Sequence, residues 1–329
     1  MTASDHQPPT SPDQASDEMP DDAPPSGGLV GGLTKLARPT QWSKQVFVLV
    51  GPVYGMIDGR TISWFGVLMA TIAVSLAASG CYAVNDIRDR EADRMHPRKK
   101  RRPVASGRVP VGVARWFAVG LFAGSIGATL VIPGSGGMWT LAAVGTYIAS
   151  TLAYSAGLKR AVILDVIILA SGFVLRVLAG CAAGGVEPST WLLNVTFFVS
   201  MFLALGKRLG ERRVMTQAGL DASAARAVQA GYTVEFLRMA VVVTAVATLA
   251  TYAGYVLERD ADFTRGFNLL WLTMLPATYG LLRSIVLVER GVYDDPTELA
   301  TKDPPFQIAV GLFGAITVGL VLAASRGWV

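Results

Sequence analysis

The chain has few charged residues, few histidines and few cysteines, and each shortage excludes a class of chemistry. Only 16% of its 329 residues are charged, whereas soluble domains carry about 25%. The two histidines, His6 and His96, stand far apart, and the sequence holds no Ser/His/Asp set, zinc-ligand spacing or dinucleotide-binding glycine fingerprint. The two cysteines, Cys81 and Cys181, are expected near opposite ends of their helices, too far apart for a disulfide. This composition favours chemistry that needs little proton transfer.

What the chain does have is long apolar runs. Hydrophobic residues make up 52% of it and the mean hydropathy is +0.44. The runs approach the ~20 residues that a membrane-spanning helix requires, which argues against a soluble helical core. We predict an all-α, multi-pass membrane protein with about nine transmembrane helices, the first of them short, interrupted by Gly51, Pro52 and Gly55, and therefore tilted or re-entrant. The candidate spans are 45–58, 61–84, 112–132, 136–156, 161–183, 189–206, 235–257, 267–288 and 306–325.

The first residues differ from the rest in composition. Residues 1–28 contain six acidic residues, many Pro and Ser, and no Lys or Arg. Such a segment cannot bury enough apolar surface to fold, and it lacks the basic and apolar regions of a signal peptide. We therefore predict a disordered cytoplasmic tail over residues 1–33 and a membrane-embedded domain over residues 34–329.

Basic residues are distributed unevenly between the two sides of the predicted membrane domain. With the N-terminus inside, the inner segments hold 22 Lys and Arg residues and the outer segments hold four. Because cytoplasmic loops are enriched in Lys and Arg, this predicts a protein of the cell (inner) membrane with its N-terminus and its polar loops in the cytoplasm. The net charge of +5 then lies on the inner face, and its spread over several loops argues against nucleic-acid binding.

Three polar residues follow the second candidate span at helical spacing. If this segment is helical, Asn85, Asp89 and Asp93 are related as i, i+4 and i+8 and share one face. Carboxylates on one face repel each other unless a cation lies between them, and Mg²⁺ bound by one or two carboxylates plus substrate phosphates would satisfy them. The alternative is a solvated helix end whose carboxylates pair with Arg90 and Arg94.

A basic run comes directly after the acidic motif. Pro97 and Pro103 bracket residues 98–102 and predict a loop there. Arg101 and Arg102 in this loop would suit the phosphates of a Mg²⁺-bound substrate. The alternative is a plain positive-inside anchor.

Four more positions are candidates, each with a structural alternative. Asp165 lies about one turn inside an apolar segment and needs a partner, which could be Lys159, a magnesium ion or a substrate hydroxyl. Arg176 is deeper and should face the bundle interior, paired with a carboxylate or a lipid phosphate. Lys207 is either a surface partner of an acid four residues on or part of a second phosphate clamp. Lys44 is either a membrane-interface anchor or a substrate contact.

Taken together, these residues resemble the UbiA superfamily of intramembrane prenyltransferases over about residues 34–325. The resemblance implies nine helices around a central cavity that opens to the bilayer, with a polar site capped on the cytoplasmic side. The family motif Asn-Asp-x-x-Asp-x-x-x-Asp and the family element Tyr-x-x-x-(x)-Lys are matched by Asn85, Asp86, Asp89 and Asp93 and by Tyr154 and Lys159.

One departure from the prenyltransferase pattern refines the resemblance. Prenyltransferases of this superfamily carry a second aspartate-rich motif after the sixth helix, but here residues 206–211 read Gly-Lys-Arg-Leu-Gly-Glu. That segment, together with residues 38–44, 96–107 and 172–180, resembles the decaprenyl-phosphate phosphoribosyltransferase branch. Arg283 and the segment 296–299 fit the same branch.

The resemblance to this branch implies a reaction and a set of roles. 5-Phosphoribose would pass from 5-phosphoribosyl diphosphate (PRPP) to a polyprenyl (decaprenyl) phosphate with Mg²⁺ as cofactor, and the product would feed cell-wall arabinan (arabinogalactan) precursors. A UbiA-type prenyltransferase and a non-enzymatic transporter or lipid carrier stay open, as does a homo-oligomer. The implied metal ligands are Asp89, Asp93 and Asn85; the implied phosphate contacts are Lys44, Arg101, Arg102, Lys207 and Arg208; the implied contacts of the ribose and lipid phosphate are Tyr154, Lys159, Asp165 and Arg176.

Overall fold

The computed structural model describes residues 28–56, 59–95, 99–217, 231–263, 266–290 and 302–326. Within these residues the regular elements are all helices, which confirms the all-α prediction. They are α1 (Leu29–Ala37), η1 (Pro39–Gln45), α2 (Val46–Gly55), α3 (Trp64–Arg88), α4 (Arg90–Arg94), η2 (Lys99–Arg101), α5 (Val111–Leu130), α6 (Ser135–Ala156), η3 (Leu158–Arg160), α7 (Leu164–Gly184), α8 (Thr190–Gln217), α9 (Val234–Glu258), α10 (Asp260–Phe263), η6 (Leu269–Thr273), α11 (Met274–Glu289) and α13 (Pro304–Ser325).

Seven helical segments in the described residues are long and apolar enough to cross a membrane. They are α3, α5, α7, α8, α9, α13 and the combined segment Leu269–Glu289 of η6 and α11. The other two predicted spans form helices α2 and α6. Helix α2 is ten residues long with Pro52 inside it, as the interrupted first span led us to expect. A multi-pass fold is therefore present, and the count of nine spans stays a prediction.

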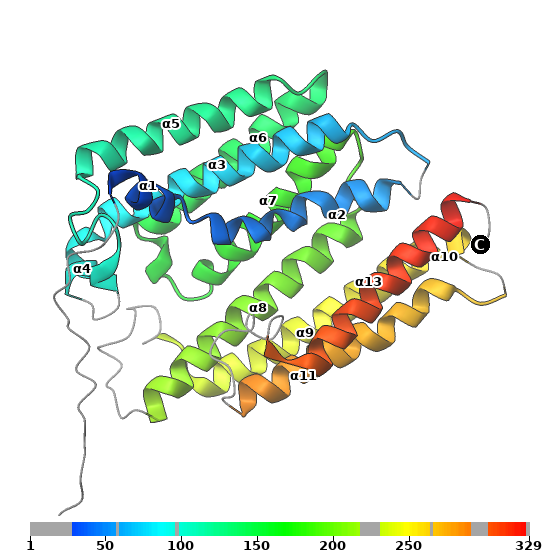
Figure 1. The fold of residues 1–329 in the computed structure, drawn as a ribbon. Helices are drawn as coiled ribbons and strands as arrows, with labels where there is room; N and C mark the ends of the chain where they lie inside the picture. The colour runs from blue at the N-terminus through cyan, green and yellow to red at the C-terminus, as the bar shows by residue number, and fades with distance from the viewer. Residues whose placement is uncertain are drawn as a thin grey trace, which may run out of the picture.

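The long helices run side by side in one bundle. Figure 1 shows α5 along one edge and α11 along the opposite edge, with α1 and α4 together at one end and the C-terminus at the other. Helix α1 packs on α3 because its apolar residues recur at helical spacing, and Leu36 is fully buried in the cluster that also holds Ala83 and Val109. The predicted boundary at residue 33 is therefore wrong, since it falls inside α1; residues 1–27 lie outside the described residues.

Glycines let α2 and α7 approach each other more closely than larger residues would permit. A Cβ added at Gly180 of α7 would lie 1.8 Å from the carbonyl oxygen of Val48 in α2. A Cβ added at Gly51 of α2 would lie 2.1 Å from Cys181 Sγ in α7. Small residues at such contacts are the usual means of close helix packing in membranes, where no hydrophobic force drives helices together. This contact places the end of η1, at Gln45, against the middle of α7.

We expect Gly180→Ala to lower the melting temperature of the detergent-purified protein, because overpacking typically costs about 1–3 kcal/mol. Gly120→Ala on α5 is the matched control, since an added Cβ there meets nothing within 4 Å, and it should leave the melting temperature unchanged or slightly raised. Scanning fluorimetry on both variants measures the difference. Equal melting temperatures would contradict the close α2–α7 contact.

Candidate functional site

The acidic motif spans the junction between α3 and α4. The Asp89 N–H donates to the Asn85 carbonyl oxygen at 2.9 Å, and the Asp93 N–H donates to the Asp89 carbonyl oxygen at 2.8 Å. The predicted helical spacing is thus present in the backbone. However, α3 ends at Arg88, and the Asp89 backbone leaves the α-helical conformation before α4 begins. The carboxylates of Asp89 and Asp93 consequently have different partners instead of sharing one face.

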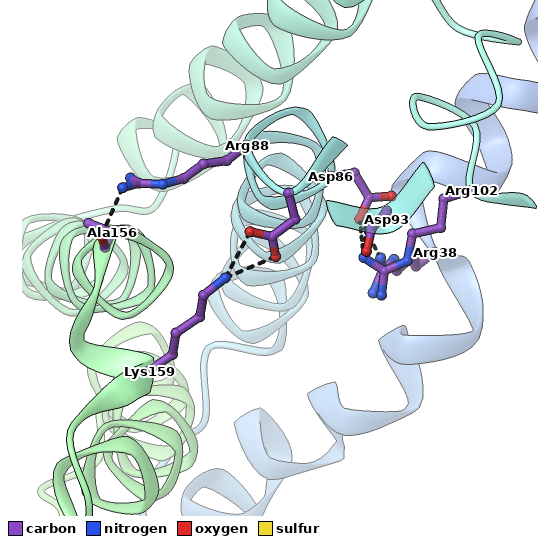
Figure 2. Close-up of polar contacts among 8 residues, drawn as sticks. Arg38, Asp86, Arg88, Asp93, Arg102, Ala156 and Lys159 are labelled. Atoms are coloured by element: carbon purple, nitrogen blue, oxygen red, sulfur yellow. Dashed lines mark hydrogen bonds and ion pairs between the residues drawn. The ribbon is translucent and has the colours of Figure 1, made fainter. Parts of the chain in front are cut away.

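Asp89 forms an ion pair with Lys159, the lysine of the Tyr-x-x-x-(x)-Lys element. The Lys159 Nζ donates to both carboxylate oxygens of Asp89, at 2.8 and 2.9 Å. Close by, Arg88 Nη2 donates to the carbonyl oxygen of Ala156 at 2.8 Å, which joins the end of α3 to the end of α6 (Figure 2). The alternative in which Lys159 pairs with Asp165 is therefore wrong, and Lys159 instead belongs to the acidic motif.

A second ion cluster lies on the other side of the α3 end and is centred on Asp86. This carboxylate is only 2% exposed and accepts from Arg38 Nη2 at 2.7 Å and from Arg102 Nη1 at 3.2 Å. Arg102 Nη1 also donates to Asp93 Oδ2 at 2.7 Å. The basic loop is thus folded onto the acidic motif, so Arg102 is more than a positive-inside anchor. Figure 2 shows Arg38 and Arg102 meeting the two carboxylates there.

Two residues of this cluster, Asp86 and Arg38, were not among the predicted site residues. Asp86 was visible in the sequence as the second residue of the acidic motif, and Arg38 as the first residue of the segment 38–44. Arg38 adopts a left-handed conformation, with φ 53° and ψ 59°, between α1 and η1. That conformation is strained for a residue with a side chain. The ion pair with the buried Asp86 offsets the strain and fixes the turn.

Asp165 belongs to a third cluster, which is fully buried at the start of α7. Its Oδ2 accepts from Arg208 Nε at 3.3 Å and from Nη2 at 3.2 Å, and its Oδ1 accepts from the Tyr232 hydroxyl at 2.6 Å. Arg208 Nη1 also donates to Glu211 at 3.2 Å. Burial, with the hydrogen bond to Asp165, raises the pKa of Tyr232 above its ordinary value, so this hydroxyl stays a donor. Sequence reasoning missed Tyr232, which stands 67 residues from its partner.

Arg176 is the buried cation of the α7 interior, and its partners are uncharged. It is 5% exposed and donates to Gln45 Oε1 at 3.1 Å, to the Gly172 carbonyl at 2.8 Å and to the Tyr147 hydroxyl at 3.1 Å. Its guanidinium also lies over the rings of Tyr147 and Phe173. In the described part of the chain no carboxylate pairs with it. The other predicted partner, a lipid phosphate, stays a prediction.

For the remaining predicted residues the structure gives a position, but no contact that distinguishes between their alternative roles. Lys44, Tyr154, Lys207 and Asn85 are half-buried, and Arg101 is exposed. Residues 96–98, at the start of the predicted phosphate-binding loop, lie outside the described residues. The described chain contains no group of three or more His, Cys, Asp or Glu side chains able to hold a metal ion, so any such ion would take part of its coordination from elsewhere.

The comparison with known protein families decides the family. The UbiA prenyltransferase family matches residues 46–310. The chain belongs to this family. The decaprenyl-phosphate phosphoribosyltransferase of Mycolicibacterium smegmatis is 36% identical over 91% of this chain and 96% of its own length. The enzyme of the same name from Corynebacterium glutamicum is 36% identical over 86% of this chain and 85% of its own length. The resemblance inferred from the motifs is confirmed at both levels.

Solved UbiA structures share the fold. A UbiA homolog from Archaeoglobus fulgidus, solved with GPP and Mg²⁺, aligns with a TM-score of 0.64 at 20% identity, covering 90% of this chain and 99% of the homolog. A digeranylgeranylglyceryl phosphate synthase structure aligns with a TM-score of 0.59 at 16% identity, covering 90% of this chain and 97% of the other. The all-helical UbiA arrangement is thereby confirmed.

We expect Asp86→Asn to lower the melting temperature clearly, because it leaves Arg38 and Arg102 without a shared counter-charge. Breaking a fully buried pair costs about 3–5 kcal/mol, and the loss here should be smaller because both arginines are partly exposed. Glu91→Gln is the control: it removes the same charge in the neighbouring helix, where the side chain is 67% exposed, and should have little effect. If both variants have the same melting temperature, Asp86 does not organise the site.

Proposed function

We propose that this protein transfers 5-phosphoribose from PRPP to the phosphate of a polyprenyl (decaprenyl) phosphate, releasing diphosphate in a Mg²⁺-dependent reaction. The support from sequence is the family and the relatives at 35–36% identity over most of the chain, which carry the name decaprenyl-phosphate phosphoribosyltransferase. The observation that carries the proposal is the meeting of the Asp89 and Asp93 carboxylates with Lys159 and Arg102 at one end of the bundle. Alternating carboxylates and cations suit a magnesium diphosphate.

The donor set of the acidic motif fits Mg²⁺. Asp89 and Asp93 offer carboxylate oxygens, and Asn85 offers a carboxamide oxygen; Mg²⁺ prefers oxygen ligands and usually takes one or two carboxylates plus substrate phosphates. These three residues would supply the metal ligands, and one ion shared by both carboxylates would require them to leave their separate partners, Lys159 and Arg102. When bound, Mg²⁺ supplies neutralisation of the charge that develops on the diphosphate leaving group.

The cations of the site would act as charge-assisted donors to phosphate oxygens. Lys159 and Arg102 are already beside the metal-binding carboxylates, so they would contact the diphosphate, together with Lys44 and Arg101. Lys207 and Arg208 are the proposed contacts of the 5-phosphate. Asp165 accepts from Arg208 and is itself held by the Tyr232 hydroxyl, so in this proposal Asp165 positions Arg208 instead of touching substrate.

The chemistry needs no general base. A lipid phosphate is already an anion at neutral pH, so one of its oxygens can attack C1 of the ribose directly. The new C1–O bond forms as the bond from C1 to the diphosphate oxygen breaks, and the electron pair leaves with the diphosphate. Attack from the opposite face inverts C1. Catalysis would then come from positioning and electrostatic stabilisation, in agreement with a chain of only two histidines.

The setting of the reaction follows from the same features. The ion pairs of Asp86, Asp89 and Asp93 lie at the junction of α3 and α4, and Figure 1 shows α4 at the end of the bundle that also holds α1. We assign this end to the cytoplasmic side of the cell membrane because of the basic inner segments. PRPP would enter from the cytoplasm, and the polyprenyl tail of the acceptor and product would stay in the bilayer. The product would serve cell-wall arabinan precursor synthesis.

A UbiA-type prenyltransferase is the second candidate, because the family carries that name and a structural neighbour was solved with GPP. The sequence disfavours it: the segment after the sixth predicted span holds Lys207 and Arg208, where prenyltransferases carry a second acidic motif. In the structure Arg208 forms ion pairs with Asp165 and Glu211, so its positive charge has carboxylate partners within this site.

We expect the purified protein to move radiolabel from PRPP into the organic phase when polyprenyl phosphate and Mg²⁺ are present. Asp89→Ala or EDTA should reduce transfer at least about 10²-fold, the usual cost of removing an electrostatic stabiliser. Glu91→Gln should transfer normally. Consumption of a prenyl diphosphate with an aromatic acceptor, in place of label transfer, would identify a prenyltransferase; inactivity in both assays would favour the lipid carrier.

Lys159→Met should lower kcat/KM for PRPP by about 10- to 100-fold, because a charge-assisted contact to the diphosphate is lost. The Mg²⁺ requirement should remain, since Asp89 and Asp93 are intact. Lys35→Met, at an exposed lysine of α1, is the control and should change kcat/KM less than twofold. Steady-state kinetics with PRPP varied provides the measurement, and an unchanged kcat/KM in Lys159→Met would remove Lys159 from the site.

A further inference from the structure

No carboxylate among the described residues pairs with the charge on Arg176. All three hydrogen-bond partners, Gln45, Gly172 and Tyr147, are uncharged. A buried cation whose partners are all neutral keeps a net positive charge in a low-dielectric region, which is unfavourable without an anion. The guanidinium has five N–H donors, and three are used by these partners. Two donors and one full charge are left for a ligand.

Gln45 has an unused hydrogen-bond donor in the same place. Its side chain is 4% exposed, its Oε1 accepts from Arg176 Nε, and its Nε2 is buried without a hydrogen-bond partner. Turning the carboxamide over does not remove the problem, because the NH₂ would then face the Arg176 N–H as donor against donor. A buried polar group without a partner is unfavourable, and only an acceptor arriving from outside can satisfy this one.

Tyr147 adds a third donor. Its hydroxyl oxygen accepts from Arg176 Nη2, and its own O–H is then available for a further acceptor. The guanidinium, the carboxamide NH₂ and the phenol O–H therefore all have donors to spare. The acceptor oxygens of Gln45 and Tyr147 are already used by Arg176. An assembly of donors around one positive charge selects an anionic oxygen, and a phosphate group matches it best because guanidinium–phosphate contacts are strong and can be bidentate.

This group lies deeper in the bundle than the metal-binding carboxylates. Tyr82 connects the two levels: the Arg38 guanidinium lies 4.9 Å from the centre of its ring, and the Tyr82 side chain packs against the core cluster that contains Tyr147. Tyr82 precedes Asp89 by seven positions, which is about 10 Å along an α-helix. The α2–α7 contact at Gly180 holds Gln45 at this depth.

We propose that Gln45 and Tyr147 complete, with Arg176, an intramembrane site for the phosphate of the lipid acceptor, and that Gln45 is its specificity-determining residue. The ligand class is a lipid phosphomonoester, whose head can descend to this level while its tail stays in the bilayer. The proposal rests on the proposed function for the identity of the lipid. The donor set itself requires only a phosphate.

The test uses the full-length protein and two readouts. Gln45→Leu should raise the KM for polyprenyl phosphate about tenfold, the effect of losing a hydrogen bond to a charged group, with the KM for PRPP within twofold of wild type. Tyr147→Phe removes one hydroxyl with little change of shape and should raise the same KM by a smaller factor. Thr146→Val is the control on α6, since the Thr146 hydroxyl bonds only to the Ala142 carbonyl of its own helix, and should change neither constant.

Binding without turnover separates this proposal from the function. Polyprenyl phosphate should raise the melting temperature of wild type and of Thr146→Val, and the rise should be lost in Gln45→Leu. Polyprenol, which lacks the phosphate, and inorganic phosphate, which lacks the lipid tail, are the comparison ligands, and neither should match it. If the transfer assay fails but this pattern of binding is observed, the lipid-phosphate site is supported and the proposed transferase function is contradicted.

Three results would overturn the site. Active Gln45→Leu with unchanged KM values would show that the carboxamide has only a structural role. Equal stabilisation by polyprenol or by inorganic phosphate would show that the site does not select a lipid phosphate. A loss of stability in Gln45→Leu and Tyr147→Phe with intact lipid binding would show that these residues support the helix contact alone.

Discussion

The structure of the site depends on the neutralisation of one buried carboxylate. Asp86 is at the end of a membrane helix, and the cost of burying its charge is met by Arg38 from the chain before α3 and by Arg102 from the chain after it. A single carboxylate therefore draws three segments together and folds the basic loop onto the acidic motif. The partners of Asp93 and the conformation of the turn at Arg38 both follow from that arrangement.

Pairing divides the cations of the site into two kinds. Arg38, Arg102, Lys159 and Arg208 each have a carboxylate, so they can be positioned without any ligand. The hydrogen-bond partners of Arg176 among the described residues are neutral, so in the proposed site a bound anion would compensate its charge. The first kind suits a polar donor that arrives with its own metal, and the second suits an anion that arrives through the bilayer. In the proposed function, one bundle would thereby offer two chemically different places for two phosphate-bearing substrates.

The sequence predicts the helices and the motif residues, but it does not predict which side chains of different helices contact each other. Run length predicted the membrane helices, and motif spacing predicted the helical backbone path from Asn85 through Asp89 to Asp93. The pairing of Lys159 with Asp89 was not predicted. Helical periodicity defines faces within one helix, but the deciding contacts cross between helices: Arg176 and Gln45 stand 131 residues apart, and Asp165 and Arg208 stand 43 apart. The end of α3 before Asp89, which separates the carboxylates, could not be predicted, because no glycine or proline marks it in the sequence.

The glycine contact between α2 and α7 fixes the position of α2 along the axis of α7. Because the backbones touch at Val48 and Gly180, α2 cannot slide along α7, and the level of Gln45 relative to Arg176 is set by the protein. The proposed phosphate level in the bilayer is then a property of the fold and does not depend on the lipid. Acceptors with shorter or longer tails would present their heads at the same height, and the difference in length would be taken up in the membrane, beyond the reach of the reacting atoms.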